Sequence, residues 1–156
     1  MNKKNFSEKR RHPRMPVISN LIEPVNLHYK TEDGKETNLV AILADLSASG
    51  MRMISFLGAP LADKFSISMQ LPGSEKMEIG AKLAWVKQRE NVYTIGIEFT
   101  KIKDKDAALI SDMADDFNDC DTRILLKLPE VCVATCKAHR ICNKIQKDET
   151  LFEDKK

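Results

Sequence analysis

Apolar and polar residues alternate along most of the first hundred positions of the chain. Side chains that alternate in this way point to opposite faces of a strand, so each segment is expected to bury one face. Turn signals separate the segments, among them Asp33-Gly34, Pro72-Gly73 and Glu90-Asn91. The expected strands are residues 23–30, 36–46, 50–55, 65–71, 77–85 and 93–99. Six strands at hairpin spacing predict a mainly β fold, an antiparallel barrel or sandwich.

The apolar period changes after residue 104. The residues that recur at helical spacing are Ala107, Ile110, Met113, Ala114 and Phe117. They predict an amphipathic helix that packs on the sheet, with Asp104 as its cap. After Pro129, a second amphipathic helix is predicted over residues 131–145, followed by a charged tail.

The composition is typical of a folded domain rather than a disordered chain. The 156 residues are 42% hydrophobic and 31% charged, with a net charge of +2. This balance argues against a general nucleic-acid binder. No apolar run is long enough for membrane insertion, and no secretory signal follows the charged N-terminus. We therefore expect a cytoplasmic protein whose four cysteines are mostly reduced.

Two short motifs lie on either side of the first predicted strand pair. The stretch Asp45-Leu46-Ser47-Ala48-Ser49-Gly50 joins two apolar runs, and its residue types are those of a turn. Upstream, Arg10-Arg11-His12-Pro13-Arg14 is a dense basic cluster. An Arg-x-x-x-Arg cluster followed by an Asp-x-Ser-x-x-Gly corner resembles the PilZ domain, a bacterial module that binds cyclic di-GMP.

The resemblance extends from Arg10 to about Phe117 and implies a domain organisation. Residues 1–9 would form a flexible basic tail, and residues 10–118 would form a six-stranded antiparallel PilZ-type barrel with its packing helix. Residues 119–156 lie outside the resemblance and are interpreted as a helical extension that contains the cysteines.

The resemblance also implies a ligand site. Arg10 and Arg14 would be the paired arginines, with Arg11 as a helper and Lys9 close to the ligand. Asp45, Ser47 and Gly50 would form the half of the site that belongs to the barrel. Arginine can pair with phosphate and with the O6/N7 edge of guanine, while a carboxylate suits the N–H edge of guanine. Glycine would allow the ligand to approach the backbone closely. No cofactor other than this ligand is expected.

Residues 10–16, here called the arm, contain prolines and charges but few apolar groups. We expect the arm to be mobile in the free protein, because it has little surface to bury. Ligand binding would then order it and change the surface presented to an unidentified protein partner. The sequence leaves open whether the protein is a monomer or a dimer. Trp85 and Tyr93 are interpreted as core or barrel-surface aromatics rather than as a stacking platform.

Three residues of the extension could be metal ligands. Cys132, Cys136 and His139 would share one face of a helix, and Cys120 or Cys142 could be the fourth zinc ligand. No Cys-x-x-Cys pair is present, so the prediction is packing thiols and no metal. No catalytic set is apparent either, and no enzymatic activity is expected. Two alternatives to a cyclic di-GMP receptor stay open, namely an interaction module that does not bind nucleotide and a metal- or redox-sensing protein.

Overall fold

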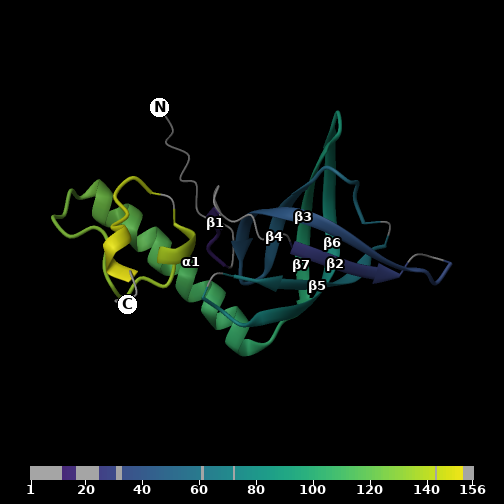
Figure 1. Cartoon of the computed structure of the whole chain (residues 1–156), viewed down its shortest axis with the longest axis horizontal. Helices are drawn as coiled ribbons and strands as arrows, with labels where there is room; N and C mark the ends of the chain where they lie inside the picture. The colour runs from purple at the N-terminus through teal and green to yellow at the C-terminus, as the bar shows by residue number, and fades with distance from the viewer. Residues whose placement is uncertain are drawn as a thin grey trace, which may run out of the picture.

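A computed structural model describes residues 12–16, 25–30, 33–60, 62–71, 73–142 and 144–152. In this part of the chain, seven strands precede one long helix (Figure 1). The strands are β1 (Met15–Pro16), β2 (Val25–Lys30), β3 (Glu36–Ser47), β4 (Gly50–Ser55), β5 (Lys64–Gln70), β6 (Lys76–Arg89) and β7 (Val92–Lys101). The helix, α1, is Asp104–Leu125.

The strands form one antiparallel sheet in the order β1-β3-β2-β5-β6-β7-β4. An additional pairing between β3 and β4 closes the last six strands of this order into a barrel, while β1 lies on β3. Alternate side chains of the strands point inward, and the fully buried ones include Leu27, Met53, Ile67, Ile79 and Ile95. The predicted six-stranded barrel is confirmed, and β1 is an element that the alternation did not reveal.

The arm is fixed to the barrel at its last residues. Met15 is 0% exposed and pairs with Leu46 of β3, and Pro16 pairs with Asp45. We expected the arm to have too little apolar surface to fix itself on the barrel. This is wrong at Met15, because a single large apolar side chain reaches the core. Proline is tolerated here because β1 lies at the edge of the sheet order.

Helix α1 packs its apolar stripe against the end of the barrel formed by β1 and β3. The buried stripe includes Ile110, Met113, Ala114 and Phe117, as the helical spacing predicted. Asp104 does not cap the helix, because Lys103 occupies the N-cap position and makes no side-chain cap hydrogen bond. Asp104 lies instead in the first turn, where its negative charge interacts favourably with the positive end of the helix dipole. No helix in the described ranges is both long enough and apolar enough to cross a membrane.

The predicted boundary between residues 118 and 119 lies inside α1, which continues to Leu125. There the helix ends in a Schellman motif. Lys127 adopts a positive φ of 53°, its N–H donates to the Ile124 carbonyl, and the Leu128 N–H donates to the Arg123 carbonyl. The chain therefore turns back after α1 instead of continuing along it.

The prediction of a second helix over residues 131–145 is wrong. Beyond α1, the described part of the extension contains as helical structure only two short 3₁₀ turns, His139–Ile141 and Glu149–Phe152. Eight of the fifteen residues 131–145 are valine, threonine, isoleucine or cysteine, and all of these disfavour the helix interior relative to alanine or leucine. The segment folds back beside α1 (Figure 1), where Ala138, His139 and Ile141 are buried.

Candidate functional site

The corner between β3 and β4 is organised by the hydroxyl of Ser47. Its Oγ accepts a hydrogen bond from the Ser49 N–H at 3.3 Å and donates one to the Gly50 carbonyl at 3.3 Å. Ser47 is buried, whereas Ser49 is exposed. Ser47 therefore shapes the turn, and Ser49 is the serine that presents its side chain to solvent.

Gly50 is required by the sheet itself. It pairs with Glu98 of β7, and a Cβ at this position would overlap the carbonyl oxygen of Ile97. The close approach that excludes a side chain here is thus between two strands. The predicted reason, close approach of a ligand to the backbone, is not needed to explain the glycine.

Asp45 lies between the arm and β4. It is opposite Pro16 on one side and Arg52 on the other, next to an irregularity in the β3–β4 pairing. The Nε of Arg52 is 2.7 Å from Oδ2 of Asp45. The carboxylate is largely covered, with 15% of its side chain exposed, whereas 46% of the Arg52 side chain is exposed. One carboxylate oxygen of Asp45 is therefore already engaged by a cation.

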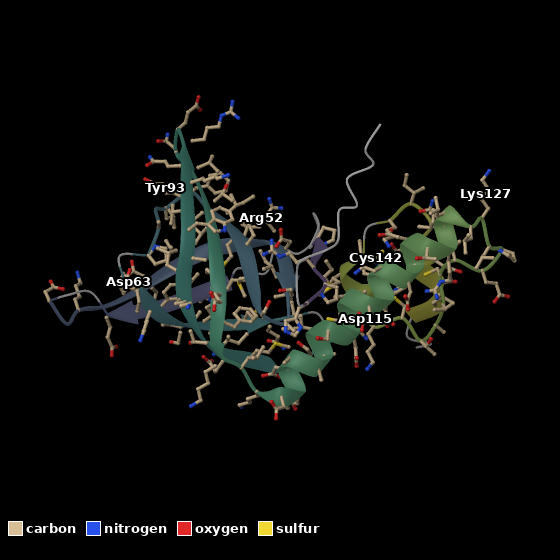
Figure 2. The ribbon with its side chains drawn as sticks, turned by 180° about the vertical axis from the view of Figure 1, so that it is seen from behind. Arg52, Asp63, Tyr93, Asp115, Lys127 and Cys142 are labelled. Atoms are coloured by element: carbon tan, nitrogen blue, oxygen red, sulfur yellow. The ribbon has the colours of Figure 1, made fainter. Side chains whose placement is uncertain are left out.

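An open pocket of about 340 Å³ lies beside this corner. The polar and aromatic residues that line it include Arg14, Ser47, Ser49, Gly50, Arg52, Trp85 and Glu98. The structure thus brings Arg14 together with Ser47 and Gly50, whereas Asp45 is not part of the lining. Figure 2 shows Arg52 between the β6–β7 hairpin and the end of the barrel that α1 covers. Lys9, Arg10 and Arg11 lie outside the described residues, so their part in the site stays a prediction.

Trp85 is a pocket residue that the sequence analysis missed. A Cβ on Gly96 would overlap the indole, so the ring lies across Gly96, which is also the partner of Arg52. The indole is 40% exposed, and Nζ of Lys87 is 5.7 Å from its ring centre. A glycine opposite the tryptophan in a paired strand is the signal that could have placed the ring on this face. Of the two positions expected for Trp85, core or barrel surface, the structure has the barrel surface, beside the pocket.

The charges around the pocket are mixed, but cations are in excess among the residues just described. Arg14, Arg52 and Lys87 are close to it, while Glu98 is the acidic residue in its lining. Glu98 is itself 3.4 Å from the amine of Lys82, and Asp45 is paired with Arg52. Among the described residues, Arg14 forms no ion pair with a carboxylate, so an anion that enters the pocket would meet its guanidinium without competition.

The comparisons with known proteins agree with this fold. The family model of the PilZ domain matches residues 8–115. Bacillus subtilis inhibitor of motility (MotI/DgrA) is structurally similar, with a TM-score of 0.52 and 16% identity over 78% of this chain and 54% of that one. The PilZ domain of YcgR from Escherichia coli, solved with c-di-GMP, also gives 0.52 and 16%, over 78% and 99%. YcgR of the same organism in complex with c-di-GMP gives 0.52 and 17%, over 77% and 50%.

The chain thus spans about half the length of MotI and of the longer YcgR. At these identities, the similarity shows a shared fold. No curated protein is similar enough in sequence to be matched with this chain.

Proposed function

Because the chain belongs to the PilZ domain family, we propose that it is a receptor for cyclic di-GMP. The observation that carries this proposal is the pocket in which Arg14 meets the Ser47–Gly50 corner, although more than thirty residues separate them in the sequence. The solved YcgR structures, which have this fold, contain c-di-GMP.

The lining of the pocket suits the two parts of such a ligand. Arg14 and Arg52 offer guanidinium groups to the phosphates or to the O6/N7 edge of guanine. Trp85 offers an aromatic face on which a base can stack. Asp45 lies beside the pocket rather than in its lining. Its carboxylate keeps one oxygen that Arg52 does not bind, and that oxygen can accept from the N–H groups of guanine. Arg10, with Arg11 as helper and Lys9 nearby, would close over the other side.

We further propose that ligand binding regulates a protein partner. Ligand binding would order the arm upstream of its anchor at Met15 and change the surface around the pocket. A protein partner would recognise that changed surface, and the receptor itself would carry out no chemical reaction. The cytoplasmic location, the absence of nucleic-acid binding and membrane insertion, and the choice between monomer and dimer stay predictions.

Titration of the full chain with cyclic di-GMP by calorimetry tests the proposal. We expect saturable binding, and we expect Arg14→Ala to weaken it at least about tenfold, because a charge-assisted contact is worth about 1.5–3 kcal/mol. Arg89→Ala is the matched control, since Arg89 lies at the end of β6 outside the pocket lining. If Arg14→Ala and Arg89→Ala bind cyclic di-GMP equally well, Arg14 is not part of the site. If the wild type does not bind cyclic di-GMP, the receptor function is refuted.

One observation favours an alternative. The 2.7 Å pair with Arg52 engages one oxygen of the Asp45 carboxylate and competes with recognition of guanine, as expected for an interaction module that no longer binds nucleotide. Titration of Arg52→Ala separates the two functions. The interaction module would be supported if Arg52→Ala binds cyclic di-GMP and the wild type does not. Binding of cyclic di-GMP by the wild type would exclude it.

A further inference from the structure

All four cysteines of the chain line one small cavity at the far end of α1. Cys120 comes from α1, and Cys132, Cys136 and Cys142 come from the segment that folds back beside it. The cavity measures about 20 Å³, which is room for little more than a water molecule or a metal ion. Each thiol is partly buried and free, and Cys142 is seen beside α1 in Figure 2.

One backbone N–H points at a sulfur of this cavity. The Lys144 N–H donates to Sγ of Cys142 at 3.4 Å. An N–H directed at sulfur stabilises the thiolate over the thiol, and hydrogen bonds of this kind orient and tune thiolate ligands of metals.

Cations surround the same cavity. Arg123, Lys144 and Lys147 line it, and the side chains of the two lysines are only 10% and 15% exposed. Lys144 is paired with Asp121 at 2.7 Å, and Lys147 is 3.6 Å from Glu149. Four thiolates around a divalent ion carry a net charge of −2. These cations would offset part of it, since the two lysines are also paired with carboxylates.

The extension has little else to hold it in place. Beyond α1 its described part has no helix or strand apart from two 3₁₀ turns, and its buried residues are Ala138, His139 and Ile141. A short irregular segment with so small a core commonly depends on a metal or a disulfide for its folding energy.

We propose that Cys120, Cys132, Cys136 and Cys142 are the four thiolate ligands of a soft transition-metal centre. Each thiol would release its proton to solvent as the sulfur–metal bond forms, with no change in oxidation state of the sulfur. This ligand set differs from the one that a helix would give, because His139 is not part of it. Its Nε2 is 2.8 Å from the Asp148 carbonyl, so it ties the two ends of the segment together.

In the described part of the chain, no three histidine, cysteine, aspartate or glutamate side chains are already arranged around a single ion. The thiols surround the cavity, and metal binding therefore requires rotation of their side chains toward its centre. Because thiolate ligation alone suits both zinc and iron–sulfur clusters, the experiment must distinguish the two.

The test uses the full chain, purified without oxygen in the presence of a reductant. Metal and sulfide are measured per chain by mass spectrometry and chemical assay, together with the visible absorption spectrum. About one zinc per chain with no visible colour would support a zinc site, and iron with sulfide and visible absorption would support a cluster. The absence of stoichiometric metal, or cysteines paired as disulfides, would overturn the proposal.

A double variant assigns the ligands. Cys132→Ser with Cys136→Ser should lose at least about nine-tenths of the metal, since two of four ligands are removed. The control is Ala134→Ser with Thr135→Ser, at two exposed positions between these cysteines, which should keep the metal. Retention of the metal by the cysteine variant would refute the ligand set.

If the cysteine variant does not fold, alkylation of the wild type replaces it. Chelation should convert four protected thiols into reactive ones, and four thiols that react equally before and after chelation would overturn the proposal. Arg14→Ala serves as a further check, because it should keep the metal whether or not it weakens nucleotide binding.

Discussion

Replacing Met15 with alanine tests how the arm is held on the barrel. Strand β1 pairs with β3 at only two positions, Met15 with Leu46 and Pro16 with Asp45, and Pro16 is exposed. The Met15 side chain, which is 0% exposed, is therefore the main anchor. Truncating a buried methionine to alanine costs about 2–5 kcal/mol of unfolding free energy. Part of that loss should appear as local release of β1 rather than as weakening of the whole barrel.

Release of β1 would also affect binding of cyclic di-GMP, because Arg14 immediately precedes the anchor. Holding the backbone of one residue in place costs about 1–2 kcal/mol, so fixing Arg14 and Met15 again on binding costs about 2–4 kcal/mol. The Kd should therefore rise by at least about tenfold. Urea unfolding and calorimetric titration measure the two effects separately.

The matched control is Met77→Ala. Met77 is a buried core methionine on β6 that does not line the pocket. It should lose a comparable unfolding free energy, about 2–5 kcal/mol, while its Kd stays within about twofold of the wild type. If Met15→Ala binds as tightly as Met77→Ala, the anchor has no part in holding Arg14 for the ligand, and the reasoning fails.

Four further predictions concern the pocket. Gly50→Ala should lower the unfolding free energy by about 1–3 kcal/mol in urea, because the added Cβ meets the Ile97 carbonyl; unchanged stability would contradict this. Trp85→Ala should weaken cyclic di-GMP binding by about 1–3 kcal/mol in calorimetry if a base stacks on the indole. Asp45→Ala should also weaken binding, and cyclic di-AMP should bind the wild type poorly, since adenine lacks the N–H donors that a carboxylate accepts; equal affinities would exclude this role. Affinity should fall as salt rises, because exposed Arg–phosphate attraction is screened.

The barrel was predictable because each long strand carries its own signal. In β5, for example, Phe65, Ile67 and Met69 are buried while Lys64 and Ser66 are exposed, and the sequence alone displays that alternation. Strand β1 has no such signal, because two residues cannot establish a period. Its burial depends on one methionine finding space next to Leu46, which is a property of the folded barrel.

The site was partly predictable for a similar reason. Arg14, Ser47 and Gly50 belong to local motifs, and the fold brings these three residues to one pocket, while Asp45 lies outside its lining. Arg52 and Trp85 were missed because their positions depend on strand register. Gly96 pairs with Arg52 on one side and lies under the indole of Trp85 on the other, and only the register of three strands reveals that row.

The extension shows where helical spacing misleads. Cys132 and Cys136 are four residues apart, as on one face of a helix, yet the chain there is irregular. The helical face that lines the cysteine cavity is on α1 instead. Phe117, Cys120 and Arg123 recur there every three residues and all line the cavity. The first half of α1 packs on the barrel through Ile110 and Met113. The same helix therefore contacts both the barrel and the cysteine cavity. A division of the chain at residue 118 would separate Cys120 from the part of α1 that packs on the barrel.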